Sequence, residues 1–171
     1  MKKFLMLTVS ITFSLLNNLS GQSPEHTFSA LKDFKNKNAG EVPYYIDKQR
    51  KALAINAANE SYRGKWARAT QEFKGKSAKY DIVITTLTEE DGECTYKLFI
   101  NDKEVAQYQN PRVKKEGDSK ANRHTWKGIM LKAGDKISVA SNSHSNGIIP
   151  ENGAFAWARG RWRQLELILV K

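Results

Sequence analysis

Alternation of apolar and polar residues with a period of two dominates the chain after Pro43, and it constrains the fold more than any other feature. The clearest run covers residues 80–87, where Tyr80, Ile82 and Ile84 fall on one face and polar or smaller residues fall between them. Successive side chains of a β-strand point to opposite faces of a sheet, so this pattern predicts a half-buried strand. Clusters of glycine, asparagine and aspartate separate the runs. The chain is therefore expected to be all-β.

About eight strands are expected. Residues 80–87 and 95–100 flank a charged turn at 89–92, and we interpret this pair as a hairpin. Asn101-Asp102 then turns the chain into a strand at 104–108. The remaining predicted strands, rich in β-branched and aromatic residues, span 52–57, 65–73, 126–131, 136–141 and 163–170. About eight antiparallel strands predict a two-sheet β-sandwich of the jelly-roll type. The residues expected inside it are Tyr80, Ile82, Ile84, Leu98, Ile100, Ile137, Val139 and Leu167.

The first residues predict export. Lys2 and Lys3 precede an apolar stretch at 4–16, so residues 1–21 are expected to be a signal peptide. The stretch is shorter than the ~20 residues that cross a membrane, and no transmembrane segment is expected. The mature protein would then be periplasmic, at the cell surface or extracellular.

Two readings remain open for residues 22–51, which are polar and rich in lysine and asparagine. Phe28, Leu31 and Phe34 are spaced as on one face of a helix, which predicts a short helix. A partly ordered linker explains the same composition. The β-sandwich domain is expected to span residues 52–171.

The net charge limits the kinds of partner that the protein can bind, and the cysteine content limits the covalent links within it. Without Lys2 and Lys3, the net charge of +10 falls to +8, which favours anionic partners. After export these would be acidic polysaccharides or an anionic cell envelope, and no nucleic-acid-binding signature is present. Cys94 is the only cysteine, so no internal disulfide can form, and we expect it to be a small buried residue. No cofactor motif is found, and the sequence does not predict an oligomeric state.

Three segments carry a resemblance to a known fold. They are residues 79–83 (KYDIV), 96–105 (YKLFINDKEV) and 131–139 (LKAGDKISV). In spacing and turn chemistry, residues 52–171 resemble the galactose-binding-like β-sandwich, in the style of carbohydrate-binding modules of families six and thirty-five. The resemblance implies a ligand cleft formed by the loop before the last strand and the loop after the first.

The resemblance also implies a structural calcium ion, from which this sequence departs. The expected Glu-x-Glu strand is replaced by residues 54–57 (AINA), and Arg163 occupies the position of an acidic ligand in the last strand. A guanidinium beside a calcium ion would be repelled, so no calcium is expected at that position.

Sugar recognition needs aromatic rings that stack on a pyranose, together with planar polar groups that bind its hydroxyls. Both occur in the loops expected at one end of the sandwich, 56–66 and 141–163. The candidate ligand-binding residues are Tyr62, Trp66, His144, Asn146, Trp157, Arg159, Arg161 and Trp162. No catalytic or metal-binding residue is predicted.

Each candidate has a structural alternative. Any of the tryptophans could be core packing, and Trp126, within a predicted strand, is the one most expected there. Arg159, Arg161 and Arg163 alternate as in a strand, so they could form a guanidinium fork for carboxylate or sulfate. The same alternation would suit a solvated edge that discourages strand pairing.

The sequence therefore predicts an exported, non-catalytic carbohydrate-binding module that prefers acidic polysaccharide. A protein-binding or structural envelope sandwich is the first alternative, because the same scaffold hosts many functions. A small polysaccharide lyase is the second, with His144, Arg161 and Tyr62 as the groups that could neutralise a uronate and move a proton. A glycosidase lacks support because Glu151 stands alone and the other nearby acidic residues fall in the turn at 89–92.

Overall fold

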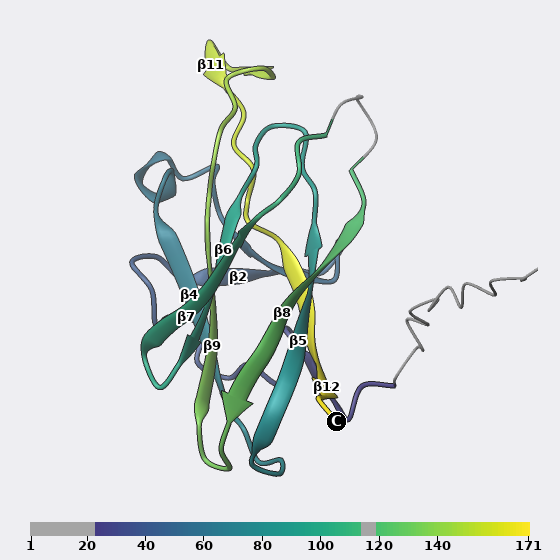
Figure 1. The fold of residues 1–171 in the computed structure, drawn as a ribbon. Helices are drawn as coiled ribbons and strands as arrows, with labels where there is room; N and C mark the ends of the chain where they lie inside the picture. The colour runs from purple at the N-terminus through teal and green to yellow at the C-terminus, as the bar shows by residue number, and fades with distance from the viewer. Residues whose placement is uncertain (1–22, 114–118) are drawn as a thin grey trace, which may run out of the picture.

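The fold is seen in a computed structural model that describes residues 23–113 and 119–171. Two antiparallel sheets pack face to face, with most loops at the two ends of the strands (Figure 1). The predicted antiparallel β-sandwich is thus confirmed. The predicted signal peptide lies outside the described residues. No helix among the described residues is long and apolar enough to cross a membrane.

The larger sheet, called sheet A, contains six strands. Its path runs β2-β3-β12-β5-β8, and β1 also pairs with β12. These strands are β1 (His26–Ser29), β2 (Tyr44–Asp47), β3 (Ala52–Ile55), β5 (Ala78–Leu87), β8 (Ala121–Leu131) and β12 (Trp162–Leu169).

The smaller sheet, called sheet B, contains four strands in the order β4-β9-β6-β7. They are β4 (Trp66–Glu72), β9 (Lys136–Asn142), β6 (Thr95–Ile100) and β7 (Lys103–Gln109). A short 3₁₀ helix, η1 (Glu60–Tyr62), lies in the loop before β4. The two-stranded hairpin of β10 (Pro150–Glu151) and β11 (Ala154–Phe155) projects from one end of the sandwich (Figure 1).

The predicted hairpin of residues 80–87 and 95–100 is wrong. Both edges of β5 are occupied, one by β8 and the other by β12, so no edge remains for β6. β6 instead pairs with β7 and β9 in sheet B. The connection at 88–94 therefore crosses from one sheet to the other. The second predicted turn, at Asn101-Asp102, does join a hairpin, formed by β6 and β7.

The segment expected to be a linker or short helix is instead part of the sandwich. β3 meets β12 at a single pair, Trp162 and Leu53, which leaves most of that edge of β12 open. β1 fills the open edge, with His26 opposite Leu167. Phe34 follows and is fully buried. The helical spacing of apolar residues was therefore overridden by a free strand edge and a gap in the core, and the sandwich begins before residue 52.

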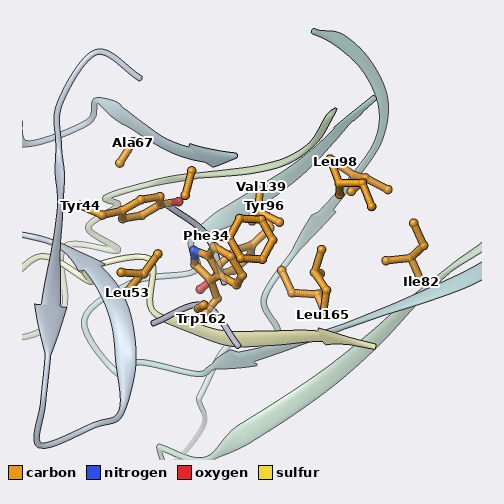
Figure 2. Packing of buried hydrophobic residues seen from close by; sticks show 14 of the residues in the cluster. Phe34, Tyr44, Leu53, Ala67, Ile82, Tyr96, Leu98, Val139, Trp162 and Leu165 are labelled. Atoms are coloured by element: carbon orange, nitrogen blue, oxygen red, sulfur yellow. The ribbon is translucent and has the colours of Figure 1, made fainter. Parts of the chain in front are cut away.

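The core lies between the sheets and includes the residues predicted to fill it. All are fully buried except Ile100, which is partly buried at the margin. Trp126 and Cys94 are also buried, as expected. Figure 2 shows the ring of Trp162 among Phe34, Tyr44 and Leu53. The last strand is thus fixed to the N-terminal segment by aromatic packing.

Candidate functional site

The two loops expected to form a cleft meet at one end of the sandwich. The Ser143 hydroxyl accepts a hydrogen bond from the Gly64 amide at 2.9 Å and donates one to the Tyr62 carbonyl at 3.0 Å. The Arg63 guanidinium lies 6.0 Å from the centre of the Trp157 ring. Tyr62 and Trp157 are both half-buried. The two loops are therefore joined, and a partly exposed aromatic ring lies at their junction.

Trp162 cannot contact a ligand, which corrects its inclusion among the candidates. Its side chain is fully buried and packs edge-on against Phe34 and Tyr44. It is the first residue of β12, and its ring lies in the core between the two sheets. Of the two tryptophans flanked by arginines, only Trp157 has an exposed surface.

Arg161 is also not a free fork for an oxyanion. Its Nε donates to a carboxylate oxygen of Asp47 at 2.9 Å, and its Nη1 bonds to the buried carboxylate of Glu89. Burial raises the pKa of Glu89, which the positive charge of Arg161 opposes. Neutralised by two carboxylates, the guanidinium fixes β2 and the 88–94 connection to the start of β12.

Arg159 and Arg163 have different surroundings, so the three arginines do not form one solvent-facing strip. The Arg159 amide donates to the Glu89 carboxylate at 3.1 Å, and its guanidinium donates to the Tyr45 hydroxyl at 2.9 Å. The Nε of Arg163 donates to the carbonyl of Arg50 at 3.0 Å. A register shift between Trp162 and Gln164 interrupts the strand alternation on which the expectation rested.

His144 and Asn146 tie the loop before β12 to the 88–94 connection. His144 Nδ1 accepts from the Glu93 amide at 3.1 Å, and Asn146 Nδ2 donates to the Glu90 carbonyl at 2.9 Å. A side chain at Gly92 would come within 2.1 Å of the His144 carbonyl oxygen, so the two segments pack backbone to backbone. Both side chains use polar atoms to hold the two segments together, so the role of His144 and Asn146 is mainly structural.

Trp66 lies on a different surface, the outer face of sheet B. The alternation of β4 puts its alanines in the core and Trp66 and Arg68 outside. The ring of Trp66 borders a groove of about 430 Å³. One wall is the segment at 39–41, which runs beside β4 because the Glu41 amide donates to the Trp66 carbonyl at 2.8 Å.

We call this groove the sheet-B groove. Its floor is the small side chain of Ala140, which lies between the rings of Trp66 and Phe99. Ala140 on β9 pairs with Arg68 on one side and with Lys97 on the other. Lys97 Nζ lies 4.7 Å from the centre of the Trp66 ring, and the Arg68 guanidinium lies 4.3 Å from the centre of the Phe99 ring. Each ring is thus covered by a cation from the strand on the other side of β9.

The sequence analysis did not identify Lys97, Phe99 or Arg68. Phe99 follows Leu98, an expected core residue, so the period of two already placed it on the solvent face of β6. An aromatic ring at an outward position was the available signal. Its importance depends on β9 lying between β4 and β6, which the sequence does not reveal.

A second hollow of about 280 Å³, called the end pocket, opens where β12 begins. The β2–β3 turn, the 88–91 segment and residues 119–121 form its walls. Burial raises the pKa of Asp91, one of its carboxylates. Among residues 23–113 and 119–171, no cluster of three or more histidine, cysteine, aspartate or glutamate side chains could hold a metal ion.

Comparison with known proteins gives one related sequence. No family model matches the chain. An uncharacterized protein of Formosa agariphila is 32% identical over 152 residues, which make up 87% of this chain and 33% of the relative. The chain thus spans about a third of the length of that relative.

Solved structures similar to this chain include carbohydrate-binding modules. The CBM36-1 domain of a multidomain xylanase from the hindgut metagenome of Trinervitermes trinervoides has a TM-score of 0.50 at 14% identity, covering 85% of this chain and 98% of that domain. The family 35 carbohydrate-binding module from Clostridium thermocellum has a TM-score of 0.47 at 8% identity, covering 84% of this chain and 98% of the module. The similarity to the CBM36-1 domain confirms the galactose-binding-like fold expected from the sequence.

Proposed function

We propose that the protein is an exported, non-catalytic carbohydrate-binding module that prefers acidic polysaccharide and binds it in the sheet-B groove. The observation that carries the proposal is the pair of rings, Trp66 and Phe99, placed on either side of Ala140 with a cation over each. The similarity of the fold to a module of a multidomain xylanase supports a carbohydrate as the ligand class.

The groove has the chemistry that a sugar chain needs. The faces of Trp66 and Phe99 can stack on the C–H surfaces of pyranose rings, and the small side chain of Ala140 leaves room between them. The Lys97 side chain, which covers Trp66, is long and flexible, so it can move aside for a sugar ring. A volume of about 430 Å³ is within the range of ~300–1,000 Å³ usual for ligand sites.

The preference for acidic chains rests on the two cations. Lys97 is paired with Glu104 at 2.9 Å, and Arg68 with Asp102 at 2.7 Å. The carboxylates are 38% and 74% exposed, and such surface ion pairs contribute only ~0–1 kcal/mol. A uronate or sulfate can therefore replace them at small cost. The guanidinium would bind either oxyanion through two donors.

The small number of carboxylates in the groove supports binding without catalysis. Glu41 is the one carboxylate that lines the groove among the described residues, and its Oε2 accepts from the Trp66 amide at 2.9 Å. Hydrolysis of a glycosidic bond usually requires two carboxylates on opposite sides of that bond. The groups considered for a lyase are also committed elsewhere, since Arg161 is bound by Asp47 and Glu89.

The test is a binding assay on immobilised polysaccharides with wild type, Trp66→Ala and Phe155→Ala. Phe155 is a matched control because it is an exposed aromatic residue, 48% accessible, on the β10–β11 hairpin outside the groove. We expect alginate or polygalacturonate to bind more tightly than neutral xylan or mannan. Trp66→Ala should weaken binding at least ~10-fold, equivalent to ~1.4 kcal/mol, and Phe155→Ala should not. Equal binding by wild type and Trp66→Ala would refute the groove as the site.

A further inference from the structure

We propose that Asn152, at the tip of the β10–β11 hairpin, is a site of spontaneous deamidation in the folded protein. The sequence contains two Asn-Gly pairs, at 146–147 and 152–153, and both lie in the segment between β9 and β12. Glycine after asparagine favours deamidation, because no Cβ shields the backbone nitrogen that attacks the side-chain amide. The surroundings of the two pairs differ, and only the second is free to react. This chemistry does not depend on what the protein binds.

The reaction needs water and no other partner. The backbone nitrogen of Gly153 loses its proton and attacks Cγ of Asn152. The new C–N bond closes a succinimide ring, and Nδ2 leaves as ammonia. Water then adds to one of the two ring carbonyls and breaks its bond to the nitrogen. Opening at Cγ gives aspartate, whereas opening at the main-chain carbonyl gives isoaspartate, in which the backbone runs through Cγ.

Hydrogen bonds hold both reacting groups of the first pair. Asn146 Nδ2 donates to the Glu90 carbonyl at 2.9 Å and to the Glu93 carboxylate at 3.2 Å. The attacking nitrogen would be that of Gly147, which donates to the Ser145 hydroxyl at 3.3 Å. Ring closure at Asn146 must break these bonds before the nitrogen can approach Cγ. The folded structure therefore protects Asn146.

The second pair has no such restraints. Asn152 and Gly153 are both exposed. Among the residues that the structure describes, no hydrogen bond involves the Asn152 side chain or the Gly153 amide. A Cβ added at Gly153 would meet no atom within 4 Å, so the space around the turn is open. Both the amide that is attacked and the nitrogen that attacks are thus accessible.

The turn has to open for the ring to close. Asn152 and Gly153 have φ angles of 49° and 78°, as in the two-residue type I′ turn of a hairpin. The attack requires rotation about the Cα–C bond of Asn152, so that the Gly153 nitrogen faces Cγ. Only two residues of β10 pair with two of β11, and the hairpin projects from the sandwich (Figure 1). Such a short hairpin is marginally stable, so its tip opens at a small cost in free energy.

The two products affect the hairpin differently. Aspartate leaves the backbone unchanged, and an Asp-Gly pair suits the same type I′ turn. Isoaspartate adds a methylene group to the backbone of a two-residue turn, so the pairing of Pro150 with Phe155 cannot keep its register. Both products place a negative charge next to Glu151. Deamidation thus lowers the net charge by one and, in the isoaspartate form, disorders the hairpin.

The test is incubation of the folded protein in mildly alkaline buffer, followed by tandem mass spectrometry of the tryptic peptide 137–159. This peptide contains both Asn-Gly pairs, so each molecule carries its own control. Deamidation at Asn152 should be at least ~10-fold faster than at Asn146, whose hydrogen bonds must break first. The rate should fall in mildly acidic buffer, where the attacking nitrogen is deprotonated less often. Asn152→Gln should not react at this position, because its longer side chain would have to close a larger ring.

The proposal is overturned if Asn152 reacts no faster than Asn146 in the folded protein. It is also overturned if Asn152 reacts only after urea has unfolded the chain, because the folded turn would then protect it. In urea the two pairs should react at similar rates, since the hydrogen bonds of Asn146 are lost. A preference for Asn152 that stayed ~10-fold in urea would mean that neighbouring residues, and not the fold, set the difference.

Discussion

The ring of Trp162 packs edge-on against the ring of Phe34, with centroids 4.8 Å apart and planes at 88°. Both side chains are fully buried, although one begins the last strand and the other lies in a segment whose composition resembles a linker. The contact completes the sandwich, because it holds the N-terminal segment against β12. It also explains why Trp162 is unavailable to a ligand.

Replacing Phe34 by alanine should lower the free energy of unfolding by about 3–5 kcal/mol, because the change removes a buried ring and leaves a cavity beside Trp162. Urea denaturation measures this loss. The neighbouring Lys35→Ala is the control, since Lys35 is exposed and its loss should cost less than ~0.5 kcal/mol. Equal stabilities of the two variants would mean that the N-terminal segment is not part of the core.

Arg161→Ala should destabilise the fold by about 3–5 kcal/mol, because it leaves the buried carboxylate of Glu89 without its charged partner. Urea denaturation of Arg161→Ala and of the exposed Arg112→Ala gives the comparison, and the second variant should resemble the wild type. If Arg161→Ala instead weakened polysaccharide binding at unchanged stability, Arg161 would be a ligand-binding residue after all.

Binding of acidic polysaccharide should weaken between low salt and ~1 M salt, because charges on the groove cations are screened over ~3 Å at the higher concentration. Lys97→Gln and Arg68→Gln should each reduce both the affinity and its salt dependence. Lys132→Gln serves as the matched control, since Lys132 is exposed and lies outside the groove. Isothermal titration at several salt concentrations measures the slope. If the affinity fell equally with salt in all four proteins, Lys97 and Arg68 would not belong to the binding site.

Acidification should destabilise the protein partly through His124. Its ring stacks on Tyr108 with centroids 3.9 Å apart, and burial lowers its pKa below the ordinary value of 6.5. The unfolded chain then binds more protons, so this contribution is present above about pH 6.5 and is lost as the pH falls toward the folded pKa. His124→Phe keeps a ring but removes the titration. The loss of stability between about pH 8 and pH 5.5 should be smaller in this variant, as measured by urea denaturation.

Calcium chelation should leave the melting temperature unchanged. The resemblance to carbohydrate-binding modules implies acidic calcium ligands at residues 54–57 and at residue 163, but Ala52–Ile55 is the third strand of this sandwich, buried and apolar, and residue 163 is an arginine. Without a bound ion, no metal-binding free energy is linked to folding. Scanning calorimetry with and without EDTA tests this. A large drop would place calcium ligands elsewhere in the chain.

The local pattern of the sequence determined the eight strands β3 to β9 and β12 and the inward residues on them. Tyr80, Ile82 and Ile84 are buried as their alternation predicted, since the period of a strand is a local property of the backbone. Turn chemistry was also local, so the hairpin at Asn101-Asp102 was predicted correctly. The candidate loops could be located for the same reason, because they lie between recognisable strands.

Only the tertiary structure decided which strands pair and which charges are free. β5 and β6 lie in different sheets because both edges of β5 are filled, and β1 exists because β12 has an open edge. The surroundings of Arg161 and Phe99 depend on residues far away in the sequence, Asp47 for the first and Arg68 for the second. Edge occupancy and charge neutralisation are relations between distant segments, whereas a sequence pattern reports what each segment prefers alone.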